Sequence, residues 1–346
     1  MTSAPDESSF ERAQLTADRF LNRSCIIYGA SGTGKTHIIR HLLFVLREHV
    51  PAVVVFSLSE KSNKTYSRDM VPRCFVHDFV TGETVRAIAD RQTRARMIYE
   101  RAANLALLGR MLDRVAPREL IATRDALQRA YDDICARGRE SGAGDAPSDA
   151  IASQFRERMI SFYSNALDAR LEAQLRATHT LSEDELFALR WFRFNPRITV
   201  VFDDCSTELA ALKSDADVLE QIFQGRHFYC TTIIALHDTS MVLPAMRMNV
   251  GVSIFTDEGL AERWINTRSS GFHREKRDAL LRYAHKVISG RAPHTKMLFM
   301  NDQAFLITAP PHGSFDAVSG AVRALAMKIE KKNSAEMEPW MRELAM

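Results

Sequence analysis

Two kinds of hydrophobic pattern alternate along the chain. Continuous apolar runs of strand length, which are typical of strands buried on both faces of a sheet, occur six times. They are residues 24–29, 52–58, 73–79, 197–204, 230–237 and 250–257. The shorter runs 297–300 and 305–308 are expected to form an edge or a hairpin. Because helical patterns separate most of these runs, the sequence predicts an α/β fold with a mainly parallel sheet.

The pattern between residues 81 and 191 is different, because apolar residues recur there every three or four positions. This spacing predicts four amphipathic helices. Three of them run through residues 98–115, 120–134 and 151–171. The fourth begins with Ser182 and Glu185, which have the spacing of a capping box. A helical insert of this kind is either a separate lid or a set of crossover helices.

These patterns divide the chain into four parts. They are an N-terminal segment (1–23), a core (24–80 and 192–310), the helical insert (81–191) and a C-terminal helical tail (311–346). In the tail, Met337, Trp340, Met341 and Leu344 recur at helical spacing. We expect this segment to pack on its own domain or, as the alternative, to dock on a neighbouring subunit.

The composition is that of an ordinary soluble globular protein, with 46% hydrophobic and 26% charged residues in a chain of 346. A formal net charge of +3 permits nucleic-acid binding without predicting it. The five cysteines form no CxxC pair, which favours a reducing compartment over a disulfide framework or a zinc site. No apolar run approaches the roughly 20 residues that cross a bilayer, so we expect a soluble intracellular protein.

The segment GASGTGKT at residues 29–36 matches the phosphate-loop pattern GxxxxGK[ST], between a predicted strand and a predicted helix. It consists of Gly29, Ala30, Ser31, Gly32, Thr33, Gly34, Lys35 and Thr36. Its glycines let backbone N–H groups turn toward phosphate oxygens, and the following helix directs its positive dipole end there. Lys35 is expected to reach the β- and γ-phosphates of ATP, and the Thr36 hydroxyl is expected to bind Mg²⁺.

The predicted strand 197–204 ends in Asp203 and Asp204. In open α/β sheets, ligands bind at the carboxyl edge of the strands, where these carboxylates would lie. We expect Asp203 to hold Mg²⁺ through water and Asp204 to orient or deprotonate the attacking water. The competing interpretation is a strand that ends in two solvated aspartates.

The acidic pair also helps to choose among classes of phosphate-loop proteins. A GTPase would carry an NKxD motif, but Asn63-Lys64 is followed by Thr-Tyr. Nucleotide kinases tend to be shorter, to carry an arginine-rich lid and to lack an acidic pair so far downstream of the loop. Asp203 and Asp204 at a strand end instead suit additional-strand ATPases, in which a carboxylate activates water.

Three further segments give a more specific, ordered set of motifs. They are VFSLSEKSNKTYSRDMVPRCFVHDF (55–79), GRHFYCTTIIALHD (225–238) and MVLPAMRMNVGVSIF (241–255). With the phosphate loop and the Asp-Asp strand, they resemble the genome-packaging ATPases of poxviruses and related large DNA viruses, in the FtsK–HerA superfamily of DNA translocases. The resemblance covers about residues 24–80 and 197–290 and leaves out the helical insert and the tail.

The resemblance implies a RecA-like additional-strand P-loop ATPase core that uses ATP and Mg²⁺ to move double-stranded viral DNA into a capsid. It implies a homo-oligomeric ring, with capsid or portal components as possible partners. It also implies the cytoplasm of an infected host cell, at the viral factory, with the virion as a second location.

The resemblance implies two further site residues. Arg247, in the LPAMR segment, matches the arginine that reaches the γ-phosphate bound by a neighbouring subunit as an arginine finger. The superfamily often has a polar sensor, commonly Gln, where this chain has His237. Because imidazole titrates near neutral pH, a sensor histidine would make hydrolysis depend on pH between about 6 and 7. A solvated arginine and a simple strand-end histidine are the competing interpretations.

Basic segments are the candidates for holding DNA, because translocases grip phosphates rather than bases. Residues 268–286 place Arg274, Lys276 and Arg277 close together, although a solvated helix of mixed charge has the same pattern. The weak net charge argues against tight binding by a monomer. A ring would present several copies of one modest patch, so avidity would compensate.

Two other pairs fall in the family-like segments. Arg226 and His227 precede the strand 230–237 as a basic pair, with a turn packed beside the sheet as the alternative. Asn63 and Tyr66 follow the second strand, and exposed polar loop residues are the simplest interpretation of them.

Two alternatives come from other functional classes. A nucleotide kinase would transfer phosphate from ATP to a small acceptor in bulk. A nucleotide-dependent virion-assembly protein would bind ATP and a capsid or membrane protein while ignoring DNA.

Overall fold

The computed structural model describes residues 12–140, 149–212, 225–238, 250–266, 274–288, 295–300 and 303–336. The chain divides into two compact units, one formed by residues 94–195 and the other by the residues up to 93 and from 196 onward. The boundary at residue 93 falls inside the helix α4 (Gly82–Ala102). The predicted insert, 81–191, overlaps the smaller unit.

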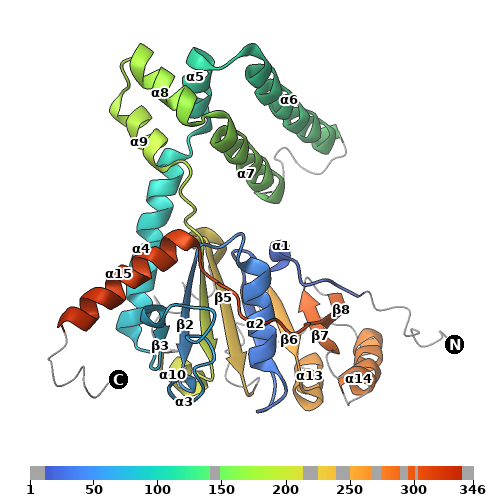
Figure 1. The fold of residues 1–346 in the computed structure, drawn as a ribbon. Helices are drawn as coiled ribbons and strands as arrows, with labels where there is room; N and C mark the ends of the chain where they lie inside the picture. The colour runs from blue at the N-terminus through green and yellow to red at the C-terminus, as the bar shows by residue number, and fades with distance from the viewer. Residues whose placement is uncertain are drawn as a thin grey trace. The chain divides into compact units, whose positions relative to one another are not determined.

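Among the described residues, eight strands form one sheet in the order β3-β2-β4-β5-β1-β6-β7-β8 (Figure 1). Their bounds are β1 Ser24–Tyr28, β2 Ala52–Ser57, β3 Val76–His77, β4 Ile198–Asp203, β5 Cys230–Leu236, β6 Val252–Phe255, β7 Thr295–Met300 and β8 Gln303–Thr308. The pairs from β3 across to β6 are parallel. The β7–β8 hairpin continues the sheet in antiparallel pairing. The predicted α/β fold with a mainly parallel sheet is confirmed.

One predicted strand is much shorter than expected. Within the run 73–79, the chain first forms a 3-10 turn at Arg73–Phe75, and only Val76–His77 pair with β2. The turn begins at Pro72, whose carbonyl accepts a hydrogen bond from the Phe75 N–H. Apolar content alone does not reveal such a turn, because periodicity cannot distinguish a strand from a helical turn in a short apolar run.

Helices cover both faces of the sheet. The bounds of those in the larger unit are α1 Ala17–Phe20, α2 Lys35–Leu46, α3 Glu60–Asn63, α10 Ser206–Ala211, α13 Glu258–Ile265, α14 Arg274–Ile288 and α15 Gly320–Glu336. Apolar residues of α2, such as Ile38 and Leu42, belong to the core on one face. Val85 of α4, Leu260 of α13 and Leu280 of α14 belong to the core on the other. The sheet is therefore buried on both sides, as its continuous apolar strands require.

The smaller unit is helical and contains more helices than predicted. Beyond the end of α4 they are α5 Leu105–Val115, α6 Arg118–Glu140, α7 Asp149–Ala166, α8 Ala169–Thr178 and α9 Glu183–Trp191 (Figure 1). The capping box of α9 is confirmed, since Ser182 accepts from the Glu185 N–H and Glu185 accepts from the Ser182 N–H.

Two predicted helices are each broken in two. The run 98–115 is interrupted before α5, where the side chain of Asn104 accepts a hydrogen bond from the Leu107 N–H. The run 151–171 is interrupted before α8, where Asp168 caps the Leu171 N–H in the same way. In both cases the apolar spacing continues across the break, so periodicity alone predicts one long helix.

The last described element, α15, is tied to the larger unit by backbone hydrogen bonds that precede it. Ser319 N–H donates to the Pro51 carbonyl, and Ala317 N–H donates to the Met70 carbonyl. The predicted helical face of Met337, Trp340, Met341 and Leu344 lies outside the described residues. None of the described helices combines the length and the hydrophobicity needed to span a membrane.

Candidate nucleotide-binding site

Three neighbouring strands bring the site together at one edge of the sheet. β1, which leads into the phosphate loop, pairs with β5, and β5 pairs in turn with β4, which ends at Asp203. β5 is therefore an additional strand between the phosphate-loop strand and the Asp-Asp strand. Since all three are parallel, their carboxyl ends meet at the edge where ligands bind in such sheets.

The phosphate loop turns on its glycines. Gly32 has a φ of 77° and Gly34 a φ of 94°, in the left-handed region that other residues rarely adopt. Gly34 is also the N-cap residue of α2, so the helix begins at Lys35. The first N–H groups of α2 and its positive dipole end therefore face the loop, an arrangement that favours an anion.

Gly29 is required for a different reason, the close approach of β6. A Cβ atom at Gly29 would lie 1.8 Å from Oγ1 of Thr256 and 2.4 Å from Oγ1 of Thr33. These two hydroxyl oxygens are 2.6 Å apart, and Thr256 also donates to the carbonyl of Tyr28. Thr256 thus fastens the phosphate loop to the end of β6.

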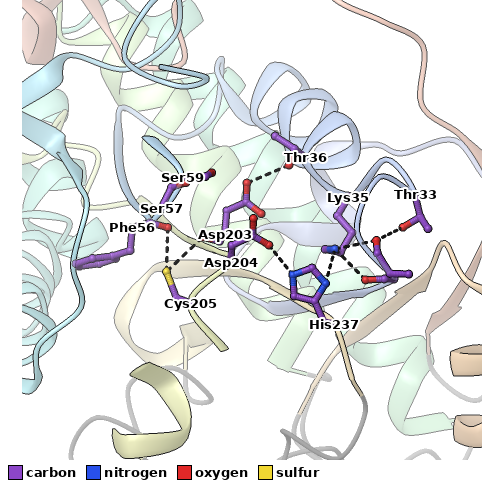
Figure 2. Close-up of polar contacts among 12 residues, drawn as sticks. Thr33, Lys35, Thr36, Phe56, Ser57, Ser59, Asp203, Asp204, Cys205 and His237 are labelled. Atoms are coloured by element: carbon purple, nitrogen blue, oxygen red, sulfur yellow. Dashed lines mark hydrogen bonds and ion pairs between the residues drawn. The ribbon is translucent and has the colours of Figure 1, made fainter. Parts of the chain in front are cut away.

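Lys35 is almost entirely buried, with 6% of its surface exposed. Its ammonium donates to the carbonyl oxygens of Gly29 (2.8 Å) and Ala30 (3.1 Å) and lies 3.2 Å from Nδ1 of His237 (Figure 2). Burial lowers the pKa of Lys35, and the carboxylates of the Asp-Asp pair oppose that shift. The lysine is therefore held between the loop and the acidic pair.

Asp203 lies deeper, with only 2% of its surface exposed. Its Oδ2 accepts hydrogen bonds from the hydroxyl of Thr36 at 3.1 Å and from that of Tyr66 at 2.7 Å. Burial raises the pKa of Asp203, and the hydrogen bond from Tyr66 opposes this shift. The other oxygen, Oδ1, is buried and has no hydrogen-bond partner among the described residues.

This donor set fits a magnesium ion. Mg²⁺ prefers oxygen ligands, keeps several waters and is usually bound by one or two carboxylates together with substrate phosphates. The Thr36 hydroxyl stands at the first turn of α2, beside the phosphate loop. The unpartnered Oδ1 of Asp203 is a buried acceptor of the kind that a metal-bound water satisfies.

Asp204 has the opposite environment from Asp203. It takes a φ of 59°, and 40% of its side chain is exposed. Its Oδ1 lies 2.8 Å from Nε2 of His237 (Figure 2). His237 follows β5 directly and therefore stands between the Asp-Asp strand and the phosphate-loop strand.

His237 joins Lys35 to Asp204, and the chemistry of its partners defines its hydrogen bonds. A lysine ammonium is a donor only, so Nδ1 of His237 accepts from Lys35. Nε2 then carries the imidazole proton and donates to the carboxylate of Asp204. The imidazole of His237 thus lies between a cation and an anion.

A comparison with protein-family models identifies the family to which this chain belongs. The model described as "AAA ATPase domain" matches residues 11–225, more than half of the chain, including the phosphate loop and the Asp-Asp pair. The chain belongs to the AAA ATPase domain family. With its phosphate loop and its additional strand, it is a P-loop ATPase of the additional-strand type.

The relatives of this AAA ATPase domain protein include viral proteins. This chain is 23% identical to the uncharacterised protein B354L of African swine fever virus (isolate Pig/Kenya/KEN-50/1950), and the match covers 88% of this chain and 85% of B354L. This relationship agrees with the viral resemblance of the motifs.

Similar solved structures include P-loop ATPases of the predicted FtsK–HerA type. One is B204, the DNA-packaging ATPase from Sulfolobus turreted icosahedral virus (12% identity, TM-score 0.37, 85% of this chain and 100% of that chain). Another is the plasmid coupling protein TrwB in complex with ADP and Mg²⁺ (14% identity, TM-score 0.36, 90% of this chain and 92% of that chain). The family assignment comes from the match to the AAA ATPase domain model and agrees with the geometry of the site.

The structure of this ATPase domain brings together most of the predicted site residues but not all. The eight residues 29–36, with Asp203, Asp204 and His237, lie at one edge of the sheet. Arg247 lies outside the described residues. The side chains of Arg226, Arg274 and Lys276 also lie outside the described part.

In the GRH segment, residues 225–227, the glycine has a structural role. A Cβ atom at Gly225 would lie 2.3 Å from the carbonyl oxygen of Cys230, so the segment turns tightly before β5. His227 is exposed in the 3-10 turn Gly225–Phe228. Asn63 is exposed at the end of α3, in agreement with the simplest expectation.

Tyr66 and Thr256 are the site residues whose roles the motifs did not reveal. Tyr66 is fully buried, against the expectation of an exposed loop residue, because its hydroxyl reaches Asp203. Thr256 belongs to no phosphate-loop motif, and its partner Thr33 is 223 positions away in the chain. The available signal for Tyr66 was its place in the family-like segment that follows β2.

Proposed function

We propose that this protein is an ATP-driven double-stranded DNA translocase that packages a viral genome into its capsid as a homo-oligomeric ring. The observation that carries the ATPase part is the chain of contacts Lys35–His237–Asp204 at the mouth of the phosphate loop. In this chain, one imidazole contacts both the Lys35 ammonium, which can bind phosphate, and the Asp204 carboxylate, which can act on water.

In this proposal the loop and Lys35 bind the phosphates of ATP. The backbone N–H groups around Gly32 and Gly34 surround the β-phosphate, and the Lys35 ammonium turns from its loop carbonyls toward the β- and γ-phosphates. Mg²⁺, when bound, would be held by the Thr36 hydroxyl and, through water, by Asp203, and would neutralise charge on the phosphates.

Asp204 orients or deprotonates the attacking water. Its partly exposed carboxylate can reach solvent, whereas that of Asp203 is buried. His237 donates a hydrogen bond to Asp204 and accepts one from Lys35, so it can register movement of the lysine toward a γ-phosphate. Arg247 of a neighbouring subunit would supply positive charge to the γ-phosphate as an arginine finger.

The DNA part of the proposal rests on the ordered motifs at 55–79, 225–238 and 241–255, which resemble those of packaging ATPases. The similarity to B354L of African swine fever virus supports a viral setting. The proposed location is therefore the cytoplasm of the infected cell, at the viral factory, or the virion, with capsid or portal components as partners. The four-part division, with the insert at 81–191, remains part of this proposal.

The test is ATP hydrolysis with and without long double-stranded DNA at low salt, where phosphate contacts are strongest. We expect DNA to stimulate hydrolysis, and Lys35→Ala to abolish both the basal and the stimulated rate. Hydrolysis that DNA leaves unchanged would instead favour a nucleotide-dependent assembly protein. Phosphate transfer to a nucleoside monophosphate would favour a kinase, although the additional strand and the Asp204–His237 pair favour attack by water.

A further inference from the structure

Tyr66 contributes a hydroxyl that the ATPase motifs do not account for. The residue is fully buried, with 0% of its surface exposed, and its hydroxyl donates to Oδ2 of Asp203 at 2.7 Å. The Thr36 hydroxyl donates to the same oxygen at 3.1 Å. Two donors from different elements therefore converge on one carboxylate oxygen.

The convergence leaves the two oxygens of Asp203 unequal. Oδ2 is occupied by protein hydroxyls, whereas Oδ1 is buried and has no partner among the described residues. Carboxylate torsions are broad and roughly two-fold, so a carboxylate held at one point can exchange its oxygens. A second donor from a fixed direction opposes that rotation and reserves Oδ1 for another ligand.

Tyr66 is itself fixed by a second buried carboxylate. Glu60, at the start of α3, has 2% of its surface exposed. Its Oε1 accepts from the Ser67 N–H at 2.7 Å, and its Oε2 accepts from the Tyr66 N–H at 3.1 Å. Lys64, with a φ of 46°, turns the chain between Glu60 and Tyr66, and its N–H donates to the Glu60 carbonyl.

The short segment 60–67 is therefore closed on itself at the Glu60 side chain. Its middle residues, 61–64, are exposed, while Glu60 and Tyr66 at its ends are buried. A loop that only had to cross the surface would not need a buried carboxylate bound to backbone N–H groups, because burying a charge is unfavourable without such partners. The closure instead sets the backbone from which Tyr66 reaches Asp203.

We propose that Tyr66 is a positioning residue for the magnesium site, which orients the Asp203 carboxylate so that Oδ1 faces the metal's water shell, and that Glu60 holds Tyr66 in place. This inference rests on the proposed ATPase function. It assigns a function to the EKSNKTY segment that follows β2.

The test measures how strongly Mg²⁺ and nucleotide favour each other's binding. The affinity of a fluorescent, slowly hydrolysed ATP analogue is measured with saturating Mg²⁺ and with EDTA, for the wild type and Tyr66→Phe. We expect Tyr66→Phe to bind the analogue as well as the wild type in EDTA, because the phosphate loop is intact. When Mg²⁺ is titrated, the Mg²⁺ concentration that gives half-maximal binding of the analogue should be about tenfold higher for Tyr66→Phe than for the wild type. This is the effect of one hydrogen bond to a charged group.

Tyr163→Phe provides a matched control. Tyr163 lies on α7 of the other compact unit and is equally buried, with 2% of its surface exposed. Its change to Phe removes a hydroxyl from a core without touching Asp203, so the Mg²⁺ dependence should stay at the wild-type value. The inference is overturned if Tyr66→Phe and Tyr163→Phe shift the Mg²⁺ dependence equally. It is also overturned if Tyr66→Phe weakens binding of the analogue in EDTA as much as in Mg²⁺.

The same experiment separates this inference from the proposed function. If the wild type binds the analogue with Mg²⁺ but does not hydrolyse ATP, the ATPase proposal fails, while the Tyr66→Phe comparison still decides the positioning role. The role of Glu60 is tested with Glu60→Gln alone and together with Tyr66→Phe. If Glu60 acts through Tyr66, Glu60→Gln should not change the Mg²⁺ dependence further in a protein that already carries Tyr66→Phe. Additive changes from the two substitutions would overturn the role proposed for Glu60.

Discussion

Asp203 and Asp204 are neighbours in the sequence, yet one is buried and the other is partly exposed. Asp203 ends β4 with 2% of its surface exposed and accepts two hydroxyls on one oxygen. Asp204 turns away from the strand at a φ of 59°, with 40% of its side chain exposed and His237 as its partner. The turn of one residue separates an inward carboxylate suited to a metal from an outward carboxylate suited to water.

The largest effect is expected from Asp204→Asn. Asparagine tolerates left-handed backbone, so the φ of 59° is preserved while the carboxylate is lost. If Asp204 is the base that activates water, kcat should fall by about 10²- to 10⁴-fold, the usual contribution of such a group. Steady-state ATP hydrolysis measures the loss, and affinity for the ATP analogue should stay near the wild-type value.

A conservative control sharpens this prediction. Asp204→Glu restores a carboxylate at a displaced position, so it should recover part of the rate that Asp204→Asn loses. Turnover by Asp204→Asn at the wild-type rate would remove Asp204 from the mechanism. The water would then have to be activated by another group.

Asp203→Asn should affect the metal rather than the water. Groups that orient a metal's ligands typically change metal affinity by about 10- to 100-fold, and we expect the half-maximal Mg²⁺ concentration for hydrolysis to rise within that range. At saturating Mg²⁺, kcat should recover most of the way, unlike in Asp204→Asn. A titration of hydrolysis against Mg²⁺ makes the measurement. If both variants lose kcat equally at every Mg²⁺ concentration, the division of roles is wrong.

The sequence was sufficient to predict this pair, the phosphate loop and the strand between them, because each depends on a contiguous motif. Thr36 and Lys35 follow the loop glycines directly, and Asp203 ends a continuous apolar strand. The contact of Tyr66 with Asp203 joins residues 137 positions apart, and the burial of Tyr66 depends on a polar carboxylate in a short turn. No local pattern indicates such a contact before the sheet order is known.

In the helical unit, the sequence pattern predicted the helices but not where they are interrupted. Its helices were expected from apolar spacing, but Asn104 and Asp168 each begin a new helix inside a spacing that continues without interruption. Both caps are single side-chain oxygens bound to a backbone N–H three residues later. Asn and Asp also occur within helices, so these residue types alone do not predict the breaks. The linear pattern also does not contain the contacts of α5 with α7, α8 and α9.

A smaller effect is expected from His237→Gln. Glutamine can keep the hydrogen bond to Asp204 but not both contacts of the imidazole, so kcat should fall by roughly tenfold, the value of one hydrogen bond to a charged group. Steady-state ATP hydrolysis by both proteins tests the idea, and equal kcat values would exclude His237 as the sensor.

The smallest effect concerns stability and again separates the two aspartates. Burial raises the pKa of Asp203 above its ordinary 3.8, so the folded protein binds a proton there more readily than the unfolded chain. Its contribution to stability is therefore present below the unfolded pKa and is lost as the pH rises through the folded pKa. Asp203→Asn removes this titration and should be more stable than the wild type near neutral pH, with a difference that narrows toward acid pH.

Thermal unfolding at neutral and acid pH measures the difference, since 1 kcal/mol shifts the melting temperature of a large domain by about 2–4 °C. Asp204→Asn is the control for the loss of a neighbouring carboxylate whose side chain is 40% exposed. If Asp203→Asn is less stable than the wild type at neutral pH, the hydrogen bonds from Tyr66 and Thr36 outweigh the unfavourable burial. The inward aspartate would then contribute to the fold as well as to the metal site.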